Sequence, residues 1–219
     1  MAQRPLTKLF AWSVQRGLVD NSPVVLVEKP GVVRKRQRTL SPAEVHAVWA
    51  ASGELGYRFG HFFRLALVLG QRWEEVARMR WVEINEAEGV WTLTGERTKA
   101  GRAHVVPLSA LAREILREAP RGRGDWVFTA LGGRPISGFS KVKARLDHLL
   151  AEGEWSGEPW RIHDLRRTMA TGLGKLGVSR FIIGRVLNHA DPMRALEGTG
   201  TACQTGRRTS RERSPTRRS

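Results

Sequence analysis

The chain has 219 residues, and its 37 lysines and arginines against 21 aspartates and glutamates give it a formal net charge of +16. This length suits one domain with a fragment of a second, and an apolar content of 41% excludes a wholly disordered chain. The lack of any run of about 18 apolar residues argues against a membrane span, and the lone Cys203 argues against an internal disulfide and favours a reducing, cytoplasmic setting.

The positive charge favours a polyanionic partner, most often nucleic acid.

The first predicted element is a helix over residues 6–16, which ends at Gly17. It is too short to be a domain, so we interpret it as the last helix of a unit whose earlier part is absent. A linker follows, and its basic residues are Arg34, Lys35, Arg36 and Arg38.

A new unit begins at Ser41, which is predicted to cap a helix. Pro42 takes the first helical position and Glu44 completes a capping box. The next predicted helix covers residues 57–69 and ends at Gly70. Because it is apolar almost all round, we expect it to be buried.

The remaining pattern predicts short strands followed by helices. The strands are expected over residues 81–84, 90–93 and 104–108, and the helices over residues 73–78, 110–118, 140–150, 165–176 and 181–187. The fold class is therefore α+β, mostly helical, with a small three-stranded antiparallel sheet. Beyond His189 the periodicity stops, so residues 191–219 are predicted to form a disordered, arginine-rich tail. The last 13 residues carry a net charge of +5, which leaves +11 on the rest.

Two basic side chains stand at positions suited to an anion. Arg72 begins a helix directly after the buried one, and Glu75 three residues later can orient it, so its guanidinium can donate two hydrogen bonds to a phosphate. The alternative is a surface ion pair. Lys99 lies at the tip of the second hairpin, where it can reach a ligand groove or remain solvated like most lysines in turns.

Two histidines complete the candidate set. His163 and Arg166 are three residues apart at a helix start, where backbone amides and the helix dipole also favour an anion. The alternative is an ordinary helix whose first turn Asp164 stabilises. His189 follows a helix directly, so it either donates a hydrogen bond to a ligand or caps the helix.

Other chemistries find little support in the sequence. The two histidines lack metal-ligand spacing and an accompanying carboxylate cluster, and no glycine-rich phosphate loop or serine nucleophile motif is present. We therefore expect no metal and no cofactor. Two arginines, a lysine and two histidines can stabilise a pentacoordinate phosphate by preorganised charge alone.

In chain order, Arg72, Lys99, His163, Arg166 and His189 resemble the active-site set of the tyrosine recombinase (phage integrase) family. The similarity extends to the sequence around them, over residues 70–76, 98–102, 105–109, 163–168 and 187–189. It covers about residues 40–189 as a whole. Five ordered matches are far more specific than any one of them.

The resemblance implies an integrase-like catalytic domain over residues 39–190. Residues 1–38 would then be the remnant of a core-DNA-binding arm with its basic linker, and residues 191–219 the tail. It also implies an enzyme of DNA recombination and integration, of the kind carried by prophages and mobile elements. Its partners would be double-stranded DNA and further copies of the chain, in a tetrameric synapse at the bacterial nucleoid.

In this family a tyrosine attacks a DNA phosphodiester, forming a 3′-phosphotyrosyl intermediate and a free 5′-hydroxyl, and a second strand reverses the step. By the resemblance, Arg72 and Arg166 would clamp the non-bridging oxygens and Lys99 would protonate the leaving 5′-oxygen. His163 would assist proton transfer from the nucleophile, and His189 would donate to the phosphate. DNA contacts are expected from Arg34, Lys35, Arg36, Arg38, Arg102 and Arg167.

The sequence departs from the family at the nucleophile, which is expected roughly 9–13 residues beyond His189. Residues 198–202 read Gly-Thr-Gly-Thr-Ala, and the single tyrosine, Tyr57, belongs to the helix over residues 57–69. Our hypothesis is that the reading frame changes near residues 191–195. Cys203 is an alternative nucleophile, although a thiophosphate intermediate suits reversible exchange poorly.

Two other functional classes remain open at this point. One is a catalytically dead integrase remnant that only binds DNA, which the missing nucleophile favours. The other is a basic transcription factor built on a helix-turn-helix, which the hairpin between helices argues against.

Overall fold

The computed structural model of the protein describes residues 3–24, 27, 37–98, 101–122, 124–130, 133–153, 155 and 157–189. The chain divides into two compact units, Met1–Gln37 and Arg38–Ser219. The first contains α1, Gln3–Gln15, which is followed by a left-handed Gly17 with φ of 66°. Apolar side chains of α1 such as Leu9 and Trp12 are about half exposed, so this unit has no core of its own among its described residues.

The second unit begins with a pair of packed helices, α2 (Pro42–Glu54) and α3 (Tyr57–Leu69). The predicted capping box is present, because the Ser41 hydroxyl accepts from the Glu44 amide and the Glu44 carboxylate accepts from the Ser41 amide at 2.7 Å. A Cβ atom on Gly60 would lie 2.2 Å from the carbonyl oxygen of Ser52. The two helices therefore pack this closely only with glycine at that position.

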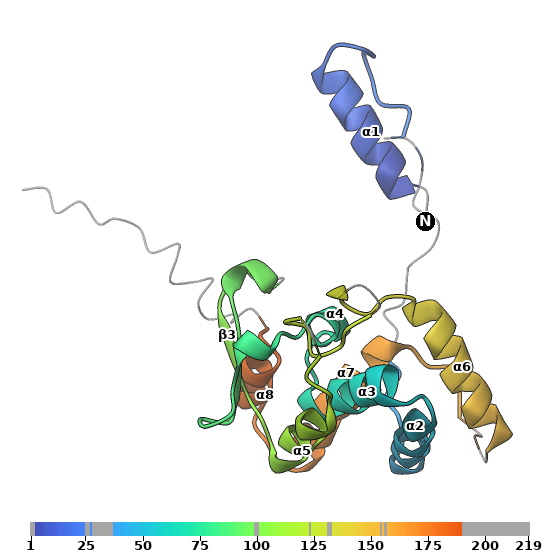
Figure 1. The fold of residues 1–219 in the computed structure, drawn as a ribbon. Coiled ribbons are helices and arrows are strands. Elements are labelled where there is room, and N and C mark those ends of the chain that lie inside the picture. The colour runs from blue at the N-terminus through green and yellow to red at the C-terminus, as the bar shows by residue number, and fades with distance from the viewer. Residues whose placement is uncertain are drawn as a thin grey trace, which may run out of the picture. The chain divides into compact units, whose positions relative to one another are not determined.

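The apolar helix α3 lies in the middle of the unit (Figure 1). It packs against α2, α4 (Trp73–Ala77), α5 (Ala110–Glu118) and α7 (Ile162–Lys175). Phe62 and Phe63 have 0% and 1% of their surface exposed. Burial of this helix on several sides, predicted from its composition, is confirmed.

The sheet is small and antiparallel, with the order β1-β2-β3. Its strands are β1 (Ile84–Asn85), β2 (Val90–Leu93) and β3 (His104–Pro107). In β2 the side chains of Trp91 and Leu93 are buried and Thr92 between them faces solvent, as the pleat requires. The predicted fold class is confirmed.

The strand predicted over residues 81–84 is wrong for most of its length. Residues Trp81–Glu83 form the 3₁₀ turn η1, and only Ile84 pairs with β2. The physical reason is competition for backbone groups. The Trp81 amide donates to the Asp125 carbonyl at 2.8 Å and the Glu83 carboxylate accepts from the Arg80 amide at 3.1 Å, so these groups are unavailable for a strand ladder.

The other helices match their predicted ranges within three residues. They include α6 (Phe139–Glu152) and α8 (Arg180–Val186). The start of the unit is fastened to α7, because the Leu40 amide donates to the Thr168 hydroxyl at 2.9 Å. Within the described residues, no helix is long and apolar enough to cross a membrane.

Candidate functional site

The turn between α3 and α4 places Arg72. Gly70 ends α3 in a left-handed conformation with φ of 60°, and a Cβ there would lie 2.5 Å from the Met169 side chain. Arg72 then caps α4, and its Nη1 donates to the Glu75 carboxylate at 2.9 Å while its backbone amide donates to the same group at 3.1 Å. Glu75 thus orients Arg72, as its spacing predicts.

Arg166 joins the ends of two helices. It lies on α7 with 6% of its surface exposed. Its Nη1 donates to the carbonyl oxygen of Gly70 at 2.9 Å, and its Nη2 donates to that of Leu187. Both acceptors are carbonyl groups, so neither brings a full negative charge to the guanidinium.

The end of α8 directs His189. Asn188 is left-handed with φ of 48°, the His189 amide donates to the Gly184 carbonyl at 2.9 Å, and the Asn188 amide donates to the Arg185 carbonyl at 3.1 Å. These two bonds make a Schellman turn. The turn ends the helix and places His189 two residues beyond Leu187, whose carbonyl oxygen accepts a hydrogen bond from Arg166.

The first turn of α7 carries His163. Asp164 is fully buried and accepts from the Arg161 amide and from Arg167, each at 2.8 Å. Asp164 therefore stabilises the start of the helix, which is the alternative role that the sequence offered for it. His163, one residue earlier, stays largely exposed and lies within the field of Arg166 and Arg72.

Charge effects show that these side chains share one neighbourhood. Burial and the charge of Arg72 lower the pKa of Arg166 to about 10, and Glu75 opposes them. Partial desolvation lowers the pKa of His189, and Arg166 and Arg72 add to the effect. The pKa of His163 is lowered by desolvation first and then by Arg167 and Arg166. Two arginines that repel each other, with two imidazoles beside them as further hydrogen-bonding groups, are suited to bind an anion.

The residues expected to contact DNA have different surroundings. The Arg38 guanidinium forms an ion pair with Glu44 and donates to the carbonyl oxygens of Thr39 and Glu158. Arg102 lies near the candidate site, since its Nη2 donates to the His189 carbonyl at 3.5 Å. Arg167 is paired with Asp164 and keeps 35% of its side chain exposed.

Several predicted positions lie outside the described residues. These are Arg34, Lys35, Arg36, Lys99 and residues 190–219, which include Cys203. Tyr57 is described, and its hydroxyl donates to the Val127 carbonyl while burial raises its pKa. Its role is therefore structural, in agreement with its place in the sequence.

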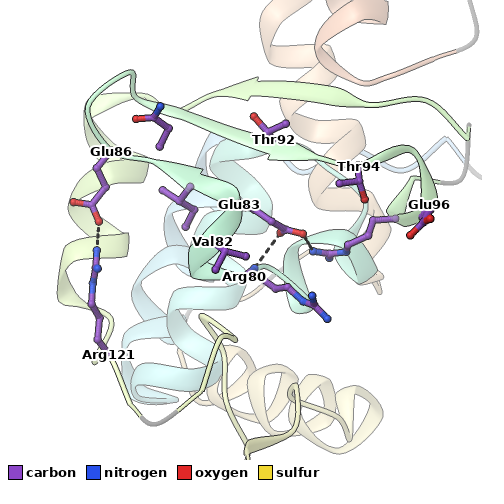
Figure 2. Close-up of a pocket in the computed structure, with 11 residues that line it drawn as sticks. Arg80, Val82, Glu83, Glu86, Thr92, Thr94, Glu96 and Arg121 are labelled. Carbon is purple, nitrogen blue, oxygen red and sulfur yellow. Dashed lines mark hydrogen bonds and ion pairs between the residues drawn. The ribbon is translucent and has the colours of Figure 1, made fainter.

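A second group of arginines lines an open pocket of about 1000 Å³ beside the sheet (Figure 2). Here the arginines face carboxylates: Arg97 pairs with Glu83, and Arg121 pairs with Glu86. Glu83 also accepts from the Trp91 indole at 3.0 Å. The positive charge of this pocket is largely neutralised by its own residues.

Two residues near the α8 end were not assigned roles from the sequence. The Gln71 amide nitrogen donates to the Val186 carbonyl at 2.8 Å, and His104 Nε2 donates to the same oxygen at 3.1 Å. A polar residue directly after a buried helix and a histidine opening an apolar strand were the available signals. Neither signal identifies the hydrogen-bond partner, because Val186 is far from both residues in the sequence.

Comparison with known proteins identifies relatives of this chain. The model of the phage integrase family matches residues 38–195. A tyrosine recombinase XerD of Ralstonia nicotianae is 30% identical over 199 residues, which cover 84% of this chain and 62% of that protein. A shufflon-specific DNA recombinase of Escherichia coli is 30% identical over 166 residues, covering 75% of this chain and 40% of that one. The chain thus spans less than two thirds of either relative.

Solved structures agree on the fold. A lambda integrase tetramer bound to a Holliday junction matches with a TM-score of 0.67 at 20% identity, over 86% of this chain and 57% of that one. The Tn1549 transposon integrase in complex with circular intermediate DNA matches with a TM-score of 0.61 at 14% identity, over 89% of this chain and 72% of that one.

Proposed function

Because the chain belongs to the phage integrase family, we propose that it binds double-stranded DNA and holds a phosphodiester for site-specific strand cleavage and rejoining. The phosphate lies against Arg72 and Arg166, with His163 and His189 beside them. The reaction class is the family's metal-free exchange through a 3′-phosphotyrosine, although residues 198–202 of this sequence supply no tyrosine at the expected position. The protein acts in the cytoplasm, at the nucleoid, as a homo-oligomer that forms a tetrameric synapse on DNA.

One observation carries this proposal: Arg72 and Arg166 lie within each other's field, and a single carboxylate, that of Glu75, acts on both. Arg72 is paired with Glu75, whereas Arg166 is anchored by carbonyl oxygens. The set has one positive charge in excess, and its mutual repulsion contributes to the lowered pKa of Arg166. A phosphodiester, with one negative charge, neutralises this excess and can accept hydrogen bonds from both guanidinium groups.

The proposed roles are those that the family resemblance implies, and the charge arrangement supports the roles of the two arginines. Arg72 and Arg166 stabilise the non-bridging oxygens as charge builds on the pentacoordinate phosphorus. The neutral imidazole of His163 can accept the proton of an attacking hydroxyl, and His189 donates a hydrogen bond to the phosphate. Lys99 protonates the 5′-oxygen when the P–O5′ bond breaks. Further contacts to the DNA backbone come from Arg34, Lys35, Arg36, Arg38, Arg102 and Arg167.

We further propose that residues 39–190 are the catalytic domain, that residues 1–38 belong to a DNA-binding arm and its linker, and that residues 191–219 are out of frame. The family match ends at residue 195, near the place where the sequence pattern stops. Translation of the other two frames at this locus tests the last point. We expect a tyrosine within an amphipathic helix in one of them, and its absence from both would contradict the frame change.

A second candidate function is DNA binding without cleavage. It is favoured by residues 198–202, where the expected tyrosine is absent. It needs the same phosphate contacts, so binding alone does not separate the two candidates. Covalent capture does.

The test uses the whole chain with a duplex that carries a nick just downstream of the cleavage position, so that the short released fragment, which carries the free 5′-hydroxyl, diffuses away. A covalent adduct supports cleavage, and Cys203→Ser is the matched control that asks whether a thiol formed it. Binding without an adduct supports the second candidate. In both cases we expect weak affinity that falls about tenfold or more between 50 and 200 mM salt, and affinity that hardly changes with salt would contradict DNA binding through phosphates.

A further inference from the structure

The carbonyl oxygen of Val186 accepts hydrogen bonds from two side chains that are distant in the sequence. Gln71, in the turn after α3, donates from Nε2 at 2.8 Å, and His104, the first residue of β3, donates from Nε2 at 3.1 Å. A carbonyl can only accept, so the neutral His104 ring carries its proton on Nε2. The same Gln71 amide group donates to the Leu69 carbonyl at 3.1 Å.

This oxygen is one that a helix leaves without a partner. The carbonyls of the last turn of a helix have no amide within the helix to accept from, and Val186 is the last residue of α8. Its carbonyl, and two carbonyls just beyond the helix, are bound by other elements. Gln71 and His104 bind that of Val186, Arg166 binds that of Leu187, and Arg102 reaches that of His189. Gln71 has 1% of its surface exposed, so its two donated bonds are formed away from water, where their loss costs most.

The turn that holds α8 also carries the phosphate-binding arginine. Gly70 offers its carbonyl to Arg166, Gln71 donates to α8, and Arg72 follows directly. His104 adds a tie from the sheet. His189 lies three residues beyond the shared carbonyl of Val186, after the Schellman turn. The position of His189 relative to the two arginines therefore depends on these bonds.

We propose that Gln71 and His104 are positioning residues: through the Val186 carbonyl they hold the end of α8 so that His189 lies beside Arg72 and Arg166. The part of this proposal that concerns phosphate binding rests on the proposed function. The hydrogen bonds themselves are a property of the protein without DNA. It is therefore tested without DNA, and the affinity of the wild-type chain for duplex DNA tests the proposed function separately.

The variants are chosen to remove or keep a single donor. His104→Leu removes it, His104→Gln keeps an amide donor of similar reach, and Gln71→Met removes the donor at similar volume. His148→Leu is the matched control, because His148 lies on α6 with 73% of its side chain exposed and pairs only with Glu152 among the described residues. Amides of α3, such as those of Phe62 and Leu65, report on global folding.

The first measurement is hydrogen exchange of the Asn188 and His189 amides by NMR. We expect about five- to tenfold faster exchange in His104→Leu and Gln71→Met, the effect of losing one net hydrogen bond. His104→Gln restores slow exchange, and His148→Leu leaves it unchanged. Unchanged exchange at both amides in His104→Leu, with α3 intact, would overturn the proposal.

The second measurement is the titration of the His189 ring by NMR. In the wild type, desolvation and the two arginines hold the pKa of His189 below its ordinary value. Release of the α8 end moves the ring away from them, so we expect its pKa to rise in His104→Leu and to return in His104→Gln. A His189 pKa that stays the same in every variant shows that the bonds do not position the ring, and this too overturns the proposal.

Discussion

The unit that begins at Arg38 has two arginine-rich regions, and they are built in opposite ways. At the end of α8, Arg166 is held by carbonyl oxygens and lies in the field of Arg72. In the pocket beside the sheet, Arg97 and Arg121 face glutamates (Figure 2). Both regions contribute arginines to the same net charge of +16. The number of arginines in a region therefore does not identify a phosphate site.

What distinguishes the regions is the partner of Arg166, which is held by carbonyl oxygens, although Arg72 beside it is paired with Glu75. A carbonyl oxygen orients an arginine and leaves its positive charge available to a ligand. A carboxylate orients the arginine and also neutralises its charge. Substitutions in the first region should therefore reduce DNA affinity. Substitutions in the second should change stability and leave affinity nearly unchanged.

The largest effect is expected for Arg166→Met. Loss of a charged donor pair to the phosphate reduces duplex affinity about 10- to 100-fold, which fluorescence anisotropy at fixed salt measures. Because Arg166 also holds two helix ends, thermal unfolding of the same variant is needed as a control. If the folded Arg166→Met protein binds the duplex with wild-type affinity, the two regions do not differ in DNA binding as we propose.

Arg97→Met should have a large effect of the other kind. It leaves the Glu83 carboxylate, whose side chain is 8% exposed, without its cation, and we expect a loss of about 1–3 kcal/mol in the free energy of unfolding. Urea denaturation measures it. The double variant Arg97→Met, Glu83→Gln should recover part of the loss. Duplex affinity should change less than about threefold, since these charges already neutralise each other.

The pH dependence should separate binding from stability. Protonated His163 and His189 attract a phosphate, so duplex affinity should rise about two- to fivefold, as for exposed ion pairs, when pH falls from about 7.5 to about 6. His163→Gln combined with His189→Gln should flatten this profile. An unaltered profile in the double variant would place the titrating groups elsewhere.

The stability of the free protein should move in the opposite direction. The pKa values of His61, His104, His163 and His189 are all lowered on folding, with desolvation as the first cause. The unfolded chain therefore binds more protons below its histidine pKa of about 6.5, and stability is lost as pH falls from there toward the folded values. Denaturant midpoints that rise with acidification over this window would contradict the shifts.

The smallest effect is expected for Glu86→Gln, which breaks the ion pair with Arg121 at the rim of the sheet pocket. Both side chains are at least 60% exposed, so the unfolding free energy should change by at most ~0.5 kcal/mol. The stacking of Arg121 on Trp81 is untouched by this change. A clearly larger change in the urea midpoint would show that this pair contributes more than its exposure suggests.

The sequence predicted those parts of the fold that depend on local signals. The capping box at Ser41, the buried helix ending at Gly70 and the pairing of Arg72 with Glu75 each involve residues a few positions apart. The strand over residues 81–84 failed because a distant residue, Asp125, binds the Trp81 amide. Local pattern contains no information about such a competitor.

The candidate site shows the same division. The side chains proposed to face the phosphate were chosen by type and order, and Lys99 among them lies outside the described residues. Their supports were not, because Gln71 and His104 meet over a backbone carbonyl of a third element, and any residue can supply a carbonyl. Arg38 was expected at DNA by its charge alone, and its bonds to Glu44 and to the Glu158 carbonyl depend on the folded arrangement of α2 and the segment before α7.

The fastening of the first residues of the second unit has a mechanical consequence. The Leu40 amide is bound by the Thr168 hydroxyl, which in turn donates to the Asp164 carbonyl on the first turn of α7. A pull transmitted along the chain from residues ahead of Arg38 reaches this turn directly. The Leu40 segment is thus tied to the helix that carries His163 and Arg166. Because the Leu40 side chain is itself buried in the core, the same pull also reaches the core.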